Sequence, residues 1–513
     1  MKKIFNWALG LSIIALTLTG CGQNNPSTTT SADTIDITEK TNGEAGTIEE
    51  TSDNSNYSEE STSESILNEL NVWVESDNVD FIKAKGEEFI KANPQYAGAS
   101  IKVTATDVAA NTGAMQIDNT ACGDIVVVAH DNIGKLSQGS LIRPLTNQEL
   151  LAQIDKDNPD AYKNVIKNYF GKSKDTLYTF GVPFVSQSLV LYYNKAYVTE
   201  DEAKSFEGLQ AAAKKADAKA LTVLGDDGFN FSFTVLAGSD ANYDTSLKLY
   251  VDGNRADQQH TYFQGEDMIA VTQWAQRMFN DPNGVEFPTS SGWAVDLKQH
   301  NVLSLIGGAW NLNAAKDALG ENMGVTILPT FTLTADDVDN TNAKVDTVMR
   351  AGTFSDCKVL TLNSACTDQT KIAMAQDFMK YISSVEIQKQ SFKECGNLPA
   401  FEGAADYIES IKSEIPAGEY DLAVAQTSMS KWSIAQPFTD GTLNTYYYSM
   451  GAPAILKNMM LHAEDNVNGK TIKYTTTDEI RQGHMRMEYI WRKGKDPVAD
   501  SSFEWPESYP YAF

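Results

Sequence analysis

Cysteine and histidine are both scarce in this chain. Its 513 residues include five cysteines and five histidines. The histidines form no His-Glu-x-x-His motif and no ligand cluster, and the cysteine spacing fits no zinc site. The four cysteines after Cys21 allow three full disulfide pairings, and buried free thiols fit the sequence at least as well. No metal and no other cofactor is therefore expected.

Basic residues are also few. Lysine and arginine together number 41 against 68 aspartates and glutamates, which gives a formal net charge of −27. A chain so acidic is poorly suited to nucleic acid and to anionic lipid headgroups. It also offers no obvious cationic cluster for uronic acids or phosphates, so a neutral ligand is favoured.

Common catalytic motifs are missing. There is no Gly-x-Ser-x-Gly sequence, and Gly469-Lys470-Thr471 lacks the first glycine of a phosphate-binding loop, because Glu464 stands at that position. A secreted glycoside hydrolase would need two carboxylates flanking one bond. With this many acidic residues such pairs carry little information. An enzyme therefore remains only a distant alternative.

Long apolar runs are limited to the N-terminus. Lys2 and Lys3 precede an apolar run from Ile4 to Thr19, as in a secretory signal. The residues Leu18-Thr19-Gly20-Cys21 resemble a bacterial lipobox, in which Cys21 is lipidated and becomes the mature N-terminus. An ordinary cleaved signal followed by a chance cysteine is the alternative. We expect residues 1–20 to be a lipoprotein signal peptide.

The next segment, residues 21–66, is rich in Ser, Thr, Asn and acidic residues. Between Asp33 and Glu64 it carries ten carboxylates against the single Lys40. Such a segment buries too little apolar surface to offset the entropy of ordering. It predicts a disordered tether behind a lipid anchor, with the folded body on the extracytoplasmic face of a bacterial cell membrane.

The remaining sequence alternates strand and helix patterns. Residues 123–129 contain a β-branched apolar run that is typical of a strand buried on both faces. Apolar pairs at 81–82 and 89–90 predict a helix that stops before Pro94. The stripe from Ile372 to Ile382 predicts another helix, with Asp368 as its N-cap. This alternation favours an α/β fold with ligands beyond the C-terminal strand ends.

Several segments in order resemble one family. They are Val72 to Asp77, Gly123 to Asp131, Val182 to Gln187, Leu191 to Lys195, Gly307 to Trp310 and Gly324 to Phe331. At this spacing, behind a lipobox, they look like the extracellular solute-binding proteins of carbohydrate ABC importers, in particular the maltose/maltodextrin-binding proteins. The resemblance runs from about Leu70 to about Met460.

The resemblance implies two α/β lobes, each a sheet flanked by helices, joined by crossing strands in a class II-like hinge, with sugar held in the cleft between them. On that pattern lobe 1 comprises residues 67–185 and 332–395, and lobe 2 comprises 186–331 and 396–513. The last forty residues extend past the matched region. We expect them to pack on the second lobe.

Sugar chemistry suggests which side chains bind. Aromatic faces suit the C–H faces of a sugar, and carboxylates or amides suit its hydroxyls. Trp310 follows Gly307-Gly308-Ala309, which would let its indole sit open on a loop; a core position is the alternative. Asp131 follows a strand end, where it could instead cap the next helix. By resemblance, the candidate ligand-binding residues are Trp310, Asp131, Tyr447, Gln187, Asp77, Asn132, Tyr446 and Phe231.

The sequence also departs from the maltodextrin binders. Val128 stands where they carry a tryptophan, Asn132 replaces an arginine, Gln187 replaces a glutamate and Asn78 replaces a lysine. The resemblance implies a monomeric binding component, not an enzyme, that captures a neutral oligosaccharide, above all a maltodextrin, and delivers it to ABC permease subunits. Another neutral oligosaccharide and a sugar-sensing surface lipoprotein remain alternatives.

The lipobox makes a direct prediction. Changing Cys21 to Ala removes the side chain that carries the lipid. Without its acyl chains the protein has no stable membrane anchor, so it should leave the membrane fraction for the medium or periplasm. Fractionation and immunoblotting measure this. Unchanged membrane association of the variant would remove the lipid anchor.

Overall fold

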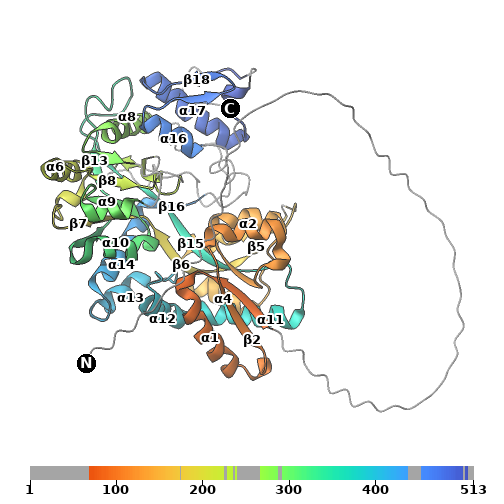
Figure 1. Cartoon of the computed structure of the whole chain (residues 1–513). Coiled ribbons are helices and arrows are strands. Elements are labelled where there is room, and N and C mark those ends of the chain that lie inside the picture. The colour runs from red at the N-terminus through yellow and green to blue at the C-terminus, as the bar shows by residue number, and fades with distance from the viewer. Residues whose placement is uncertain are drawn as a thin grey trace, which may run out of the picture. The chain divides into compact units, whose positions relative to one another are not determined.

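The structure is a computed structural model. It describes residues 69–173, 175–224, 228–234, 237–239, 266–286, 292–436, 452–500 and 503–505. The signal peptide, the tether and the lipidation site Cys21 lie outside the described residues. Two sheets, each with its own apolar core, organise the described part (Figure 1).

The first sheet has the order β16-β15-β3-β1-β2, and β6 also pairs with β15. β1, β2 and β3 are parallel, whereas β15 runs antiparallel to β3 and β6. The strands are β1 (Glu69–Val74), β2 (Ser100–Ala105), β3 (Ile125–Ala129), β6 (Gly181–Ser188), β15 (Thr353–Leu362) and β16 (Ser433–Ala435). The apolar run predicted as a strand is β3, and its first four residues are buried.

Helices cover this sheet because their apolar stripes face it. They are α1 (Val79–Ala92), α2 (Val108–Asp118), α3 (Ile133–Gln138), α4 (Gln148–Asp157), α5 (Asp160–Val165), α11 (Gln369–Ile382) and α12 (Val385–Cys395). The predicted helix before Pro94 is α1. The prediction of α11 is also confirmed, since the Asp368 carboxylate accepts a hydrogen bond from the Lys371 N–H and so caps its first turn.

The second sheet has the order β10-β8-β11-β7-β12. Its strands are β7 (Val190–Asn194), β8 (Leu221–Val223), β10 (Val285–Glu286), β11 (Ser304–Gly307) and β12 (Met323–Thr326). Around it lie α6 (Phe206–Ala216), α8 (Glu266–Asn280), α9 (Trp293–Gln299), α10 (Leu312–Leu319), α14 (Ala417–Met429), α16 (Ala452–Met460) and α17 (Thr477–Lys493). A further helix, α13 (Ala404–Ser410), packs beside α14 in a small separate core that includes Phe392 of α12. Together the two sheets confirm the α/β fold class.

Two strands join the sheets, and we call β6 and β15 the crossing strands. β6 ends at Ser188 and β7 of the second sheet begins two residues later. β15 begins at Thr353; its second residue, Phe354, is buried in the core of the second sheet, and its last, Leu362, is buried in the core of the first. The crossing strands pair with each other from Ser355↔Ser188 to Thr361↔Gly181.

Two segments pack differently from the lobe boundaries expected from sequence. β13 (Thr330–Thr332) pairs with β14 (Val348–Arg350) and β14 with β9 (Gly238–Ser239), and Met349 lies in the core of the second sheet. β16, assigned to the second lobe, pairs with β15 in the first sheet. For β13 and β14 the reason is that the chain passes between the sheets at the start of β15, not at residue 332. As boundaries of moving lobes, the predicted ranges stay a prediction.

The C-terminal segment packs on the second core, as expected. α17 lies beside α16 and α8 (Figure 1), and its Met487 and Ile490 join that core. Tyr509, Tyr511 and Phe513 lie outside the described residues. In the part of the chain that the structure describes, no helix has the length and hydropathy to cross a bilayer.

A buried charge ties this segment together. The Arg486 side chain is 6% exposed, and its Nη2 donates to Asp496 Oδ2 at 2.7 Å. Nη1 donates to the Tyr474 hydroxyl at 2.8 Å and to Asp465 in β17 (Asp465–Val467). β17 pairs with β18 (Lys470–Ile472), so the guanidinium joins the hairpin to α17 and to the loop after it.

Arg486→Met should lower the free energy of unfolding by about 3–5 kcal/mol, since it leaves two partly buried carboxylates without their cation. Urea unfolding followed by circular dichroism measures this. Lys495→Met is the matched control, because Lys495 pairs with Asp500 at 2.6 Å but its side chain is 56% exposed. This substitution should change the free energy of unfolding far less, because water screens an exposed ion pair. Equal effects of the two substitutions would contradict the assignment.

Candidate functional site

A cavity of about 670 Å³ lies between elements of the two sheets. We call it the cleft. One wall is formed by the segments that follow β1 and β2 and by the end of α12, the floor by the crossing strands, and the other wall by the turn before α10 and by α14. Its lining residues are Glu75, Ser76, Asp77, Asn78, Thr106, Asp107, Gln187, Ala309, Trp310, Leu312, Asn313, Lys358, Lys393, Glu394, Cys395, Gly396, Asn397, Glu419 and Leu422.

The parallel strands bring the first wall together. β1 and β2 are in register, with Val74 opposite Ala105, so both chains leave the sheet at the same edge. The Thr106 N–H then donates to the Val74 carbonyl at 2.7 Å, which holds the two exits side by side. Glu75 to Asn78 and Thr106 to Asp107 therefore converge, as expected for the carboxyl ends of parallel strands.

Trp310 supplies an open aromatic face. β11 ends at Gly307, and Trp310 lies in the short turn 309–311 before α10 with 45% of its surface exposed. A Cβ at Gly308 would come within 2.3 Å of the indole, so the ring lies directly over this glycine. The Asn311 side-chain oxygen accepts from the Gly308 N–H at 3.1 Å and fixes the turn. Phe229 lies against the indole, with 5.9 Å between ring centroids.

Amides line the floor and one side. Gln187 is 4% exposed and lies on β6 opposite Asp356 of β15. The Asn397 amide donates to Asn78 Oδ1 at 2.6 Å and to Ser391 Oγ at 2.8 Å, which joins the segment after β1 to α12. Amide groups offer both donors and acceptors at fixed positions, as the hydroxyls of a polyol require.

Carboxylates outnumber cations in the cleft. Glu75, Asp77, Asp107, Glu394 and Glu419 line it, against two lysines. The Lys358 ammonium is paired with Glu75, and Lys393 is paired with Glu414 at 2.5 Å. An open indole beside carboxylates and amides suits a polyhydroxylated, uncharged ligand, because anions would meet an acidic lining.

The cleft gathers three of the residues predicted from sequence: Trp310, Gln187 and Asp77. Asp131 lies at the same edge of the first sheet, 7% exposed, and accepts from the Asn132 amide at 3.0 Å, but neither residue lines the cleft in the described structure. Phe231 is 1% exposed in the core of the second sheet. As ligand contacts these three stay predictions.

Tyr446 and Tyr447 lie outside the described residues, so their predicted role stays open. Sequence reasoning missed Glu75, Lys358 and Asn397 as cleft residues. Lys358 carries a signal that could have been read, since it is a lysine next to the apolar run Val359-Leu360 within a buried strand. Asn397 carries none, because its position depends on where α12 ends.

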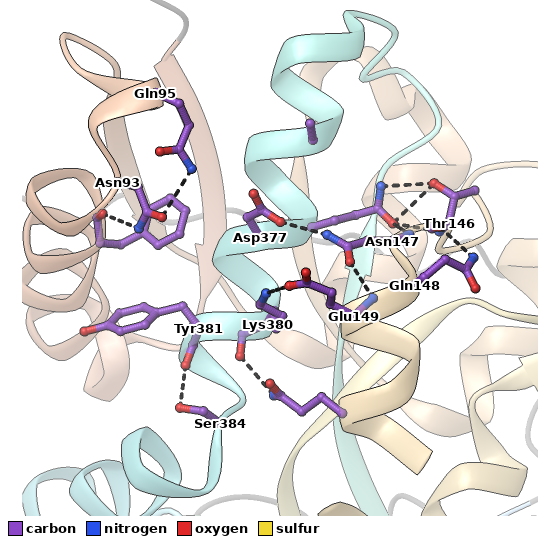
Figure 2. A pocket seen from close by; sticks show the side chains of 14 residues that line it. Asn93, Gln95, Thr146, Asn147, Gln148, Glu149, Asp377, Lys380, Tyr381 and Ser384 are labelled. Atoms are coloured by element: carbon purple, nitrogen blue, oxygen red, sulfur yellow. Dashed lines mark hydrogen bonds and ion pairs between the residues drawn. The ribbon is translucent and has the colours of Figure 1, made fainter. Parts of the chain in front are cut away.

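A second large cavity, of about 770 Å³, lies between α1, α4 and α11 (Figure 2). Its polar side chains bind one another. Gln376 Oε1 accepts from the Thr146 and Asn147 N–H groups at 2.7 and 2.9 Å, and the Asn147 amide donates to Asp377 at 2.7 Å (Figure 2). Lys380 pairs with Glu149. These contacts hold the start of α4 to α11.

A third cavity, of about 460 Å³, shares Gln187 with the cleft. It is lined by the crossing strands, by His130 and by Tyr162, whose hydroxyl bonds to Ser186. Burial raises the pKa of Tyr162 well above its usual range. β6 therefore borders two cavities, and Gln187 lines both. In the described residues no group of three or more His, Cys, Asp or Glu is placed to hold a metal ion.

Two α/β sheets joined by crossing strands, with a polar cleft and an open indole between them, define a two-lobed ligand-binding protein. Solved structures share this fold. The maltodextrin-binding protein MalE1 of L. casei, without ligand, superposes with a TM-score of 0.61 at 20% identity over 83% of this chain and 100% of that one. MalX from Streptococcus pneumoniae, in complex with maltopentaose, gives 0.59 at 18% identity with the same coverage.

Sequence comparison identifies the family. The model of the bacterial extracellular solute-binding proteins matches residues 84–451, and the chain belongs to this family. A maltooligosaccharide ABC transporter solute-binding lipoprotein of Streptococcus pneumoniae is 25% identical over 364 residues, which are 68% of this chain and 76% of that protein. The resemblance drawn from the ordered sequence segments is thus confirmed.

One cysteine thiol lies in the cleft. Cys122, Cys357, Cys366 and Cys395 are all free, and Cys395 lines the cleft. Burial, reinforced by the nearby Glu394 and Asp77 carboxylates, raises the pKa of Cys395 to about 11.

The alkylation rate of Cys395 by iodoacetamide should therefore rise about tenfold per pH unit up to pH 10, because only the thiolate reacts. Peptide mass spectrometry measures the rate, and Cys395→Ser identifies the modified peptide. A rate that levels off near pH 8.5, as for an unperturbed thiol, would contradict the burial.

Proposed function

We propose that this protein is the lipid-anchored substrate-binding component of a carbohydrate ABC importer and that it captures a neutral α-glucan oligosaccharide of the maltodextrin type. The observation that carries this proposal is Trp310, an exposed indole laid over Gly308 that lines the same cleft as several carboxylates and amides. An aromatic face next to such groups matches a sugar, which has an apolar face and a rim of hydroxyls.

The comparisons support the ligand class. Two relatives from Streptococcus pneumoniae are maltooligosaccharide ABC transporter solute-binding lipoproteins. Structures of the same fold hold maltopentaose in one case and maltotetraose in another. The acidic lining of the cleft supports a neutral sugar over a uronic acid.

Capture would proceed by hinge closure about the crossing strands. Cleft residues come from segments following the first sheet and from the turn before α10 of the second, so a bound sugar would contact both sides. Ligand shifts an equilibrium only through contacts that differ between states, and such two-sided contacts exist only when the cleft is closed. The partners would be ABC permease subunits, and the binding protein would act as a monomer without enzymatic activity.

Calorimetry with maltopentaose tests the proposal. We expect micromolar affinity or tighter, on the order of −8 kcal/mol. Trp310→Ala should weaken binding by about 1–4 kcal/mol, since it removes a desolvated aromatic contact. Gly308→Ala should also weaken binding, because its Cβ displaces the indole. Tyr197→Ala is the control: its ring is exposed and packs on His300, outside the cleft.

Unaltered affinity of a folded Trp310→Ala variant would mean that other residues form the sugar site. The proposed function would be overturned if only an acidic sugar released heat on titration, or if the protein hydrolysed any oligosaccharide in the calorimeter.

A further inference from the structure

A lysine forms part of the cleft floor. Lys358 lies on the crossing strand β15, its side chain is 10% exposed, and it lines the cleft. A buried ammonium is costly unless a negative charge and hydrogen bonds compensate it. A lysine kept at such a position therefore needs an explanation from either the fold or the ligand.

The strand pairing fixes where Lys358 lies. It is opposite Ala129 of β3 on one side and Val185 of β6 on the other. The pairing with β6 then shifts, because the next pair is Val359↔Pro183, which leaves Phe184 as an extra residue in β6. Pro183 has no N–H to give to the ladder, and such bulges bend strands and re-aim side chains next to binding sites.

The compensating charge comes from a different strand. Glu75 directly follows β1, and its carboxylate accepts a hydrogen bond from the Lys358 ammonium. In the sheet, β3 lies between β1 and β15, so the pair spans the carboxyl end of β3. The Glu75 side chain is 30% exposed and lines the cleft as well. Both charged groups therefore face the ligand cavity.

The pair has hydrogen-bonding capacity left over. The ammonium has three donors, and Glu75 is the partner it contacts in the part of the chain that the structure describes. The carboxylate can accept about four hydrogen bonds through its two oxygens. One donor and one acceptor site are used between them. The remaining donors and acceptors lie next to one another at the cleft floor.

A structural ion pair elsewhere in the chain looks different. Asp337 is 1% exposed, and Arg277 donates to both of its oxygens, from Nε at 3.0 Å and from Nη2 at 2.8 Å. The Thr334 N–H and hydroxyl each donate to Asp337 Oδ2 at 2.8 Å. That carboxylate is saturated by the protein. The carboxylate of Glu75 is open to the cavity.

We propose that Lys358 and Glu75 form the specificity-determining pair of the cleft. They bind two adjacent sugar hydroxyls, one accepting from the ammonium and the other donating to the carboxylate. Because Glu75 neutralises Lys358, the pair rejects sugars that carry a carboxylate. This assignment rests on the proposed capture of a neutral oligosaccharide and names the residues that enforce neutrality.

The charges of the pair predict that two substitutions both weaken maltopentaose binding but differ in their effect on acidic sugars. Lys358→Met removes the donors and leaves a lone carboxylate, so maltopentaose should bind at least tenfold more weakly and acidic sugars should still be excluded. Glu75→Gln keeps the ammonium but removes its neutralising charge. It should weaken maltopentaose binding several-fold and create binding of α-1,4-linked trigalacturonate, which the unaltered protein should not bind.

Calorimetry on the full-length protein with maltopentaose and with trigalacturonate tests this. Trigalacturonate binding by the Glu75→Gln variant should weaken with added salt, because salt screens the attraction between the Lys358 ammonium and the sugar carboxylate. Lys371→Met is the matched control, because Lys371 pairs with Asp124 at 2.8 Å, its side chain is 25% exposed, and it lies outside the cleft. Its maltopentaose affinity should stay within twofold.

The outcomes separate the two proposals. If the unaltered protein binds no maltopentaose, the proposed ligand fails whatever the pair does. If it binds maltopentaose and the Lys358→Met and Glu75→Gln variants bind it equally well, the pair has no role and the assignment is overturned. If Lys358→Met does not fold, Lys358→Gln replaces it. Glu75→Gln without any gain for trigalacturonate would refute the neutralising role.

Discussion

The pairing of the two crossing strands is the constraint on which the rest of this structure depends. β6 and β15 run antiparallel from Ser355↔Ser188 to Thr361↔Gly181, and each carries the chain between the two sheets. The backbone hydrogen bonds of this pairing satisfy polar groups of a connection that lies between two cores. The same pairing places Gln187 and Lys358 at the cleft floor, where a ligand would meet them.

Charge is handled in two ways in this acidic protein. Outside the cleft, buried charged groups such as Arg486 and Asp337 are hydrogen-bonded to protein partners. They hold together segments that pack around the second sheet. In the cleft, the Lys358–Glu75 pair is neutral as a unit but keeps unused donors and acceptors. A cavity with this lining can satisfy hydroxyls and penalises a buried anion, which links the proposed ligand to the composition of the chain.

Local patterns were enough to predict many single elements. The apolar run of β3, the stripe of α11 with its Asp368 cap, and the glycines before Trp310 each depend on residues close in sequence. The lobe boundary expected after residue 331 stays a prediction, and it depends on more than local pattern. β13 and β14 pair with each other across a long loop, and no local signal near Thr332 shows that the chain stays with the second sheet until Phe354.

The sequence by itself determined the α/β class, the family and an exposed indole at Trp310, because these follow from periodicity, ordered motifs and the absence of a side chain at Gly308. Only the tertiary structure decided which polar residues share the cleft. Glu75 and Lys358 are separated by 283 positions in the sequence. They meet because β1 and β15 flank β3 in the sheet, so that the two side chains reach each other across the end of β3. Phe231 enters the core while Phe229 contacts Trp310, a choice set by packing in three dimensions and not by the aromatic pattern.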